Sequence, residues 1–182
     1  MQNLYICKGS NYQHFIKMKK PFLLAVAAAA VLVTGCASLK QTPQEKERIA
    51  QLVDQRLDQR QFRIDIDYMS PRRGSGQAVS YSYSLTVDET TVNSHLPYVG
   101  VAYNVPYGGG KVLTFKDDID EYADSGWKKN QRTIAFSTNN DEDTIVYTLT
   151  VYDNGRTYVD VHCRNRDDIS YRGTLDPDKY PE

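Results

Sequence analysis

The side chains that could do chemistry are sparse in this chain, and they do not gather into a metal site. The 182 residues include three cysteines and three histidines. His162 and Cys163 are adjacent, and neighbouring residues of a strand point to opposite faces, so they cannot hold one ion. The acidic runs Asp117–Glu121 and Asp141–Asp143 lack the loop signature of a calcium site. We therefore predict no metal site and no cofactor, and we interpret the two acidic runs as a solvated loop and a hairpin tip.

Signatures of nucleophilic and nucleotide chemistry are also missing from the sequence. It contains no Gly-x-Ser-x-Gly elbow, no phosphate-binding loop and no dinucleotide fingerprint. The glycine-rich segment Tyr107–Lys111 lacks the Gly-Lys-Ser/Thr ending that cradles phosphate, so we interpret it as a flexible loop. A pair of carboxylates for glycoside hydrolysis leaves no sequence pattern, so a small hydrolase stays open as an alternative. No catalytic residue is predicted, and the sequence leans against an enzyme.

Aromatic side chains are the remaining candidates for recognition. The chain has fourteen Tyr, five Phe and one Trp. Tyrosine combines an apolar ring with a polar tip, which suits binding surfaces and ordinary β-sheets alike. Four residues form the candidate binding rim: Tyr98, Tyr103, Tyr107 and Trp127. Because Pro97 removes a ladder donor and Gly100 permits a close approach, their segment is either a structural corner that turns the sheet or a rigid rim presenting Tyr98 and Tyr103.

Cys36 lies in the most specific pattern of the chain. Met18–Lys20 is a positive n-region, Phe22–Val33 is an apolar stretch of 12 residues, and Leu32–Cys36 completes a lipobox. A lipobox is the cleavage and lipidation site of a bacterial lipoprotein. Twelve residues rise only about 18 Å in a helix, too little for a hydrocarbon core of about 30 Å. This length argues against the alternatives, a membrane anchor or a buried core helix, and we predict that Cys36 is lipidated.

These signals divide the chain into segments. Residues 18–35 are the lipoprotein signal peptide, residues 36–42 a lipidated tether and residues 43–182 a single globular domain. We interpret residues 1–17 as an upstream extension before a true start at Met18; the alternative is an unusually long n-region. Removing everything before the lipobox cysteine leaves 147 residues, in which Lys plus Arg falls from 22 to 18 against 23 Asp plus Glu. The resulting net charge is about −5, and an acidic domain without a basic stripe is a poor partner for nucleic acid.

A helix is predicted directly after the tether. Thr42-Pro43-Gln44-Glu45 is a capping box with proline in the first turn. Apolar residues then recur at helical spacing with charges between them, which predicts an amphipathic helix from Pro43 to about Gln59. The alternative is a solvated charged linker.

From Gln61 onward, apolar and polar residues alternate with the period of strands. Nine runs are predicted as strands: residues 62–68, 79–87, 91–96, 101–104, 111–115, 133–138, 145–151, 157–163 and 169–175. Asn154-Gly155 tolerates the positive φ of a tight hairpin between two of them. Short spacing without intervening helices predicts a mainly β fold, an antiparallel meander that forms a curved sheet or half-open barrel, with the N-terminal helix packed on it.

An ordered set of short motifs resembles one known family. The motifs are His95–Gly100, a Tyr-Gly-Gly loop, Ile134–Phe136, the Asn154-Gly155 turn and Ile169–Gly173. Over about Glu45 to Leu175 they are similar to the Gram-negative envelope lipoproteins catalogued as domain of unknown function 4251, with Val99 standing where the family has an aromatic residue. The resemblance implies a secreted, lipid-anchored single domain and assigns no catalytic residue.

These observations favour a non-enzymatic lipoprotein that binds an envelope component, a glycan, a peptide or a protein partner. Its membrane contact would be the lipid on Cys36. No acidic run follows that cysteine in Ala37–Lys40, so we expect the periplasmic face of the outer membrane. The alternatives are a small hydrolase acting on envelope polymers, a structural accessory subunit and, if the barrel holds an apolar cavity, a lipid or small-molecule carrier. Cys163 is expected on the apolar face of its strand, as an inert thiol.

Overall fold

Antiparallel strands make up most of the described structure. The computed structural model of the protein describes four stretches of the chain: residues 42–80, 82–103, 113–140 and 143–180. Their strands are β1 (Gln61–Pro71), β2 (Gln77–Ala78), β3 (Ser84–Asp88), β4 (Thr91–His95), β5 (Thr114–Asp118), β6 (Glu121–Lys128), β7 (Gln131–Asn139), β8 (Thr144–Tyr152), β9 (Arg156–Cys163) and β10 (Ile169–Leu175). An α-helix, α2 (Pro43–Asp58), precedes them, and a short 3-10 helix, η2 (Pro177–Lys179), follows.

Helix α2 begins where the capping box predicts. The Thr42 hydroxyl accepts a hydrogen bond from the backbone N–H of Glu45 at 3.2 Å, and a proline occupies the first turn. Val53 and Leu57 are buried, and Ile49 packs against the same core. The apolar stripe therefore attaches the helix to the sheet, while its charged residues stay outside. Among the described residues, no helix is long and apolar enough to cross a membrane.

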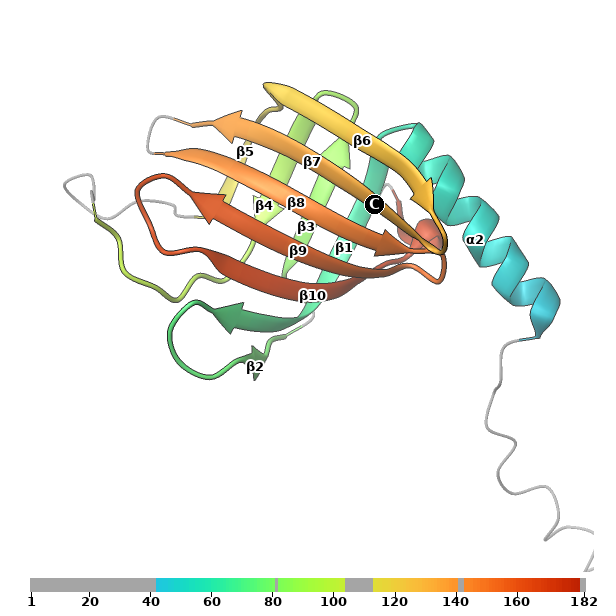
Figure 1. Cartoon of the computed structure of the whole chain (residues 1–182), viewed down its shortest axis with the longest axis horizontal. Helices are drawn as coiled ribbons and strands as arrows, with labels where there is room; N and C mark the ends of the chain where they lie inside the picture. The colour runs from blue at the N-terminus through green and yellow to red at the C-terminus, as the bar shows by residue number, and fades with distance from the viewer. Residues whose placement is uncertain (1–41, 81, 104–112, 141–142, 181–182) are drawn as a thin grey trace, which may run out of the picture. The chain divides into compact units, whose positions relative to one another are not determined.

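The strands form one curled sheet. Nine strands follow the order β5-β4-β3-β1-β10-β9-β8-β7-β6, with β2 paired to β1 off this path, and every pairing is antiparallel. Figure 1 shows the sheet curving so that β5 lies behind β6 and β7, with α2 at the end of the sheet where β1 begins. The predicted fold class, a curved sheet or half-open barrel with the N-terminal helix packed on it, is confirmed.

The two edge strands are joined by a very short link. β5 ends at Asp118 and β6 begins at Glu121, yet these strands lie at opposite edges of the sheet. In the link, the N–H of Ile119 donates to Thr90 O at 2.8 Å, and the N–H of Asp120 donates to Ser137 O at 2.9 Å. The link is therefore bonded to the turn between β3 and β4 on one side and to β7 on the other, which joins the two ends of the curled sheet at this corner.

The inner face of the sheet is the hydrophobic core. Strand residues alternate between buried and exposed positions, most regularly in β7, β8 and β9. Tyr147 is fully buried and stacks on Phe136 with ring centroids 4.9 Å apart. Its hydroxyl is 3.1 Å from Ser94 Oγ, which donates to Leu113 O at 2.8 Å. Burial raises the pKa of Cys163 to about 12, and this thiol lies on the core face as predicted.

Three parts of the strand prediction are wrong. The run 101–104 is not a strand, since its described residues, 101–103, contain only an isolated bridge at Ala102. The run 79–87 is not one strand: β2 ends at Ala78, and the sheet resumes only at Ser84. Between them, the backbone N–H of Tyr83 donates to Ser80 O at 3.4 Å, a local turn bond that replaces a bond to the neighbouring strand. Conversely, the run 117–121, interpreted as a solvated loop, contains the end of β5 and the start of β6, a strand that the sequence does not reveal.

Candidate functional site

The predicted rim segment crosses the end of the sheet that lies away from α2. After β4 ends at His95, the chain turns and pairs briefly with the connection between β9 and β10. The N–H of Asp167 donates to Val101 O at 2.9 Å, the N–H of Tyr103 donates to Asn165 O at 2.8 Å, and Ala102 forms an isolated bridge with Arg166. A short ladder therefore fixes residues 101–103.

Asp167 holds this segment from within. Its side chain is only 1% exposed and accepts hydrogen bonds from the Tyr103 hydroxyl and, at 3.2 Å, from the N–H of Val101. Arg73 lies 3.7 Å from the same carboxylate. The hydrogen bond from Tyr103 lowers the pKa of Asp167 most, and the Val101 N–H and Arg73 add to it against the opposing effect of burial. Asp167 is therefore an ionised anchor for the segment.

The predicted corner residues fix the entry to the same segment. The backbone oxygen of Pro97 accepts a hydrogen bond from the buried Tyr171 hydroxyl at 2.7 Å. The Tyr98 hydroxyl donates to the Asp167 backbone oxygen at 3.0 Å. A Cβ on Gly100 would lie 2.5 Å from the Tyr98 hydroxyl oxygen, so the ring can fold back only because this residue is glycine. Pro97, Tyr98 and Gly100 thus have the contacts of a structural corner.

Three side chains project from the fixed segment into solvent. Val99, Val101 and Tyr103 are 49%, 46% and 62% exposed, and they are three of only four large apolar side chains exposed among the described residues. We call these three residues the exposed strip. Arg73, whose side chain is 69% exposed, lies beside it. The backbone ladder orders residues 101–103, and the three side chains stay exposed among the residues that the structure describes, which is the arrangement of a docking surface.

Trp127 does not join this rim. It lies on β6 beside α2, where its indole N–H donates to Asp54 at 2.6 Å. Arg132 is the centre of this second cluster, with ion pairs to Asp54 at 2.9 Å, to Asp58 at 2.8 Å and to Asp124 through Nη2 and Nε. This Arg132 cluster ties α2 to β6 and β7, so the contacts of Trp127 are those of helix docking.

A β-bulge brings two members of the Arg132 cluster to one side of β6. Asp124 is opposite Ile134 and Trp127 is opposite Arg132, so β6 contains one extra residue. Gly126 has a φ of +63, as such bulges require. Residues three apart in a regular strand point to opposite faces, and the extra residue cancels this alternation.

Other sequence candidates fall in different places. Cys36 and Tyr107 lie outside the described residues. The Asp143 side chain, expected at an exposed hairpin tip, is instead 2% exposed, pairs with the buried Arg166 at 3.6 Å and accepts from the N–H of Asn165 at 3.0 Å. The exposed His162 contacts Asp168 at 2.6 Å, on the face opposite Cys163. Within the described stretches, no group of three His, Cys, Asp or Glu is placed to hold a metal ion.

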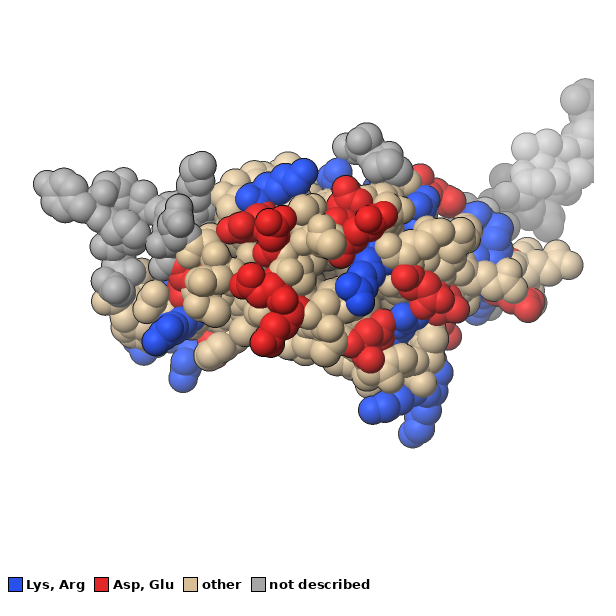
Figure 2. Space-filling model, turned by 90° about the horizontal axis from the view of Figure 1, so that it is seen from above, with Lys and Arg blue, Asp and Glu red and all other residues tan. Residues whose placement is uncertain are grey.

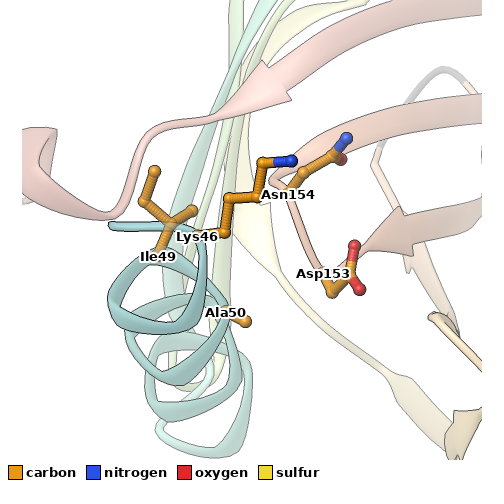
Figure 3. A pocket seen from close by; sticks show the side chains of 5 residues that line it. All are labelled: Lys46, Ile49, Ala50, Asp153 and Asn154. Atoms are coloured by element: carbon orange, nitrogen blue, oxygen red, sulfur yellow. The ribbon is translucent and has the colours of Figure 1, made fainter. Parts of the chain in front are cut away.

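Surface pockets formed by described residues include three that differ in position and lining. The first, of about 460 Å³, lies between α2 and the hairpin turn that joins β8 and β9. Figure 3 shows Lys46 extending from α2 toward that turn, with Ile49 and Ala50 on the helix side and Asp153 and Asn154 on the turn.

The other two pockets lie on the outer surface of the sheet. One, of about 340 Å³, is lined by Arg63, Thr86, Asp88, Thr91, Asn93, Lys116 and Tyr180. The other, of about 310 Å³, is lined by Asp67, Arg156, Tyr158, Arg172, Gly173 and Thr174. Each of the three pockets has a single carboxylate in its lining, whereas glycoside hydrolysis uses two. None of them therefore provides the carboxylate pair of the hydrolase alternative.

The distribution of charge on the surface is mixed. Figure 2 shows Asp and Glu side chains over the middle of one face, with Lys and Arg lying among them. Acidic and basic side chains therefore alternate on this face, and no broad basic stripe of the kind that follows a phosphate backbone crosses it.

Comparison with known proteins identifies the family. No curated protein matches the chain. Among solved structures, a crystal structure of a DUF4251 family protein from Bacteroides eggerthii shares the fold, with a TM-score of 0.53 and 16% sequence identity over 70% of this chain and 87% of that one. The profile of the family described as Domain of unknown function (DUF4251) matches residues 41–175. The resemblance seen in the motifs is thus confirmed, and the chain belongs to the DUF4251 family.

Proposed function

We propose that the protein is a lipid-anchored, periplasm-facing binding protein that engages an envelope protein through the exposed strip. The observation that carries the proposal is the fixed exposure of Val99, Val101 and Tyr103 on an anchor of buried Asp167. A buried, hydrogen-bonded carboxylate that holds apolar side chains exposed to water is unusual in a folded protein. Such an arrangement indicates that the exposed side chains have a function.

The chemistry of the strip favours a protein as the partner. Tyrosine and arginine are enriched at protein interfaces, and Tyr103 lies beside the exposed Arg73. Val99 and Val101 together supply exposed apolar area. Because the ladder with residues 165–167 already orders the segment, binding does not have to pay the entropy of ordering a loop.

The proposed anchor fits this arrangement. The tether of residues 36–42 reaches at most about 25 Å when extended, since each residue spans about 3.5 Å. It ends at the start of α2, whereas the strip lies at the end of the sheet away from α2. A lipid on Cys36 would therefore hold the domain near the membrane by one end and leave the strip accessible.

The binding proposal is tested by photo-crosslinking in the native envelope. A photoreactive amino acid at Val101 is expected to give a defined protein adduct, and the same probe at Ala123, an exposed position on β6, is expected to give none. The adduct is identified by mass spectrometry, and its affinity for purified full-length protein is then measured. Val101→Asp is expected to weaken binding at least tenfold, whereas the matched control Ala123→Asp leaves it unchanged. Equal adducts at both positions, or equal affinity of both variants, would contradict the proposal.

Anchoring is tested separately by metabolic labelling with an alkyne fatty acid. The wild-type protein is expected to carry the label and Cys36→Ser to lose it. An unmodified wild-type peptide that runs through Cys36 would refute lipidation without affecting the binding test.

A further inference from the structure

The outer face of β9 and β10 carries a pocket that the exposed strip does not use. Its volume is about 310 Å³. Strand register places Arg172 opposite Tyr158 and Thr174 opposite Arg156, so four outward side chains form a compact block. Asp67 of β1 completes the lining. The size is at the lower end of the range for ligand pockets and suits one sugar ring.

A bulge in β1 preorganises one side of this pocket. Ile66 is opposite Gly173 and Tyr68 is opposite Arg172, which leaves Asp67 as the extra residue. As a result, two consecutive residues reach the same guanidinium: Asp67 pairs with Arg172 at 2.9 Å, and the Tyr68 ring lies 5.0 Å from it. Arg172 is therefore held in place and largely neutralised before any ligand arrives.

Arg156 is the cation that remains available. Its guanidinium makes no ion pair or hydrogen bond with any residue that the structure describes, although it lines the pocket. A guanidinium offers a planar fork of donors that matches a carboxylate or a phosphate. Acidic residues outnumber basic ones in the whole chain. The guanidinium of Arg156 nevertheless gives this pocket a positive charge that attracts an anion.

Tyr158 supplies a surface for a sugar ring. It is 39% exposed, the fourth of the exposed large apolar side chains. Tyr152 packs edge-on against it, with ring centroids 6.2 Å apart, and so fixes its orientation. The hydroxyl of Thr174 and the carboxylate of Asp67 are at the same pocket and can bond to sugar hydroxyls.

From this combination we infer that the pocket binds an acidic sugar residue, a pyranose that carries a carboxylate or a phosphate. The anionic group is bound by Arg156, the ring lies on Tyr158, and ring hydroxyls bond to Asp67 and Thr174. The inference does not rest on the proposed protein partner, since the pocket and the exposed strip share no residue.

The test uses the purified full-length protein and three probes: galacturonate, glucose 6-phosphate and the neutral sugar galactose. Binding is measured by isothermal titration and by NMR. At least one anionic probe is expected to bind at least tenfold more tightly than galactose, and the tighter of the two identifies the anion as carboxylate or phosphate. Failure of both anionic probes to bind more tightly than galactose overturns the inference.

Three variants locate the binding. Arg156→Gln is expected to weaken binding of the anionic probe at least tenfold, and Tyr158→Leu to weaken binding of all sugars. The matched control Arg164→Gln removes the same charge from an exposed site just beyond the other end of β9 and is expected to change nothing. Equal losses in Arg156→Gln and Arg164→Gln would show nonspecific attraction and refute the site. Circular dichroism confirms that each variant is folded.

Discussion

Replacing Arg132 with methionine tests how α2 is held on the sheet. The Arg132 side chain is 9% exposed, and its three carboxylate partners differ in exposure: Asp124 is 22% exposed, Asp54 46% and Asp58 64%. Methionine keeps most of the apolar stem of the side chain and removes the charge. The substitution therefore isolates the ionic contribution of the Arg132 cluster.

The expected cost follows from these exposures. The shielded, bidentate pair with Asp124 belongs to the class of hydrogen bonds to charged groups, which contribute about 1.5–3 kcal/mol. The pairs with Asp54 and Asp58 are screened by water and add only about 0.2–1 kcal/mol each. We expect Arg132→Met to lower the free energy of unfolding by about 2–5 kcal/mol.

Urea denaturation followed by circular dichroism is the measurement. With a urea dependence of about 2 kcal/mol per molar, the midpoint should fall by about 1–2.5 M. Asp58→Asn removes only an exposed partner and should cost less than about 1 kcal/mol. Arg156→Met, a change of the same residue type at a site without an ion pair, should stay within about 0.5 kcal/mol of the wild type.

The pH dependence gives a second check. Burial is the largest single effect and raises the pKa of Asp124. The hydrogen bonds from Arg132 and from the N–H of Gly126, together with the charges of Arg132 and Arg60, outweigh it, so the net pKa is below its usual value. A carboxyl with a lowered pKa in the folded state contributes stability above its unfolded pKa of about 3.9, and this stability is lost as the pH falls through the folded value. The gap between wild type and Arg132→Met should therefore narrow below about pH 4. A gap under about 0.5 kcal/mol at pH 7 would refute the reasoning, as would a gap that does not change in acid.

Two further predictions concern Cys163 and Gly100. Burial, followed by the nearby Asp143, raises the pKa of the Cys163 thiol to about 12, so a thiol reagent should label the native protein only slowly. Cys163→Ala should lower the free energy of unfolding by about 1–2 kcal/mol. Fast labelling without unfolding would show that the thiol is accessible. A Cβ on Gly100 would lie 2.5 Å from the Tyr98 hydroxyl oxygen, so Gly100→Ala should displace that hydroxyl from Asp167 and cost about 1–3 kcal/mol. Hydrogen exchange at the N–H of Asp167, which donates to Val101, should then accelerate, whereas exchange at the N–H of Gly155, which donates to Tyr152, should stay as in the wild type. Unchanged exchange at Asp167 would contradict the proposed role of the Tyr98 hydroxyl.

Elements with local signals could be predicted from the sequence. The start of α2 depends on Thr42, Pro43 and Glu45, which lie within four residues of one another. The hairpin between β8 and β9 depends on one Asn-Gly pair between two alternating runs. In both cases the residues that decide the structure are neighbours in the chain, so their pattern is visible without coordinates.

Features that depend on distant partners or on a bulge could not be predicted. Strand β6 is missed because its sequence is polar and its bulge breaks the period of two. The same bulge places Trp127, predicted for the rim, in contact with α2. Asp167 was not a candidate, because its partner Tyr103 lies 64 residues away. Asp143 resembles any hairpin-tip acid until Arg166 is placed beside it.

The link between β5 and β6 has a consequence for the order of folding. On one side of it, β1 pairs with β3, β3 with β4 and β4 with β5; on the other side, each strand from β6 to β9 pairs with the next one along the chain. Each half can therefore assemble through short-range hairpins. The halves meet where Ile64 pairs with Leu175, a contact between residues more than a hundred positions apart. Closing so long a loop is entropically costly and slow, which makes the β1–β10 pairing the expected late step. Until it forms, β1 and β10 each leave one edge without a hydrogen-bonded neighbour, and the protein is most open to misassembly with other chains at that stage.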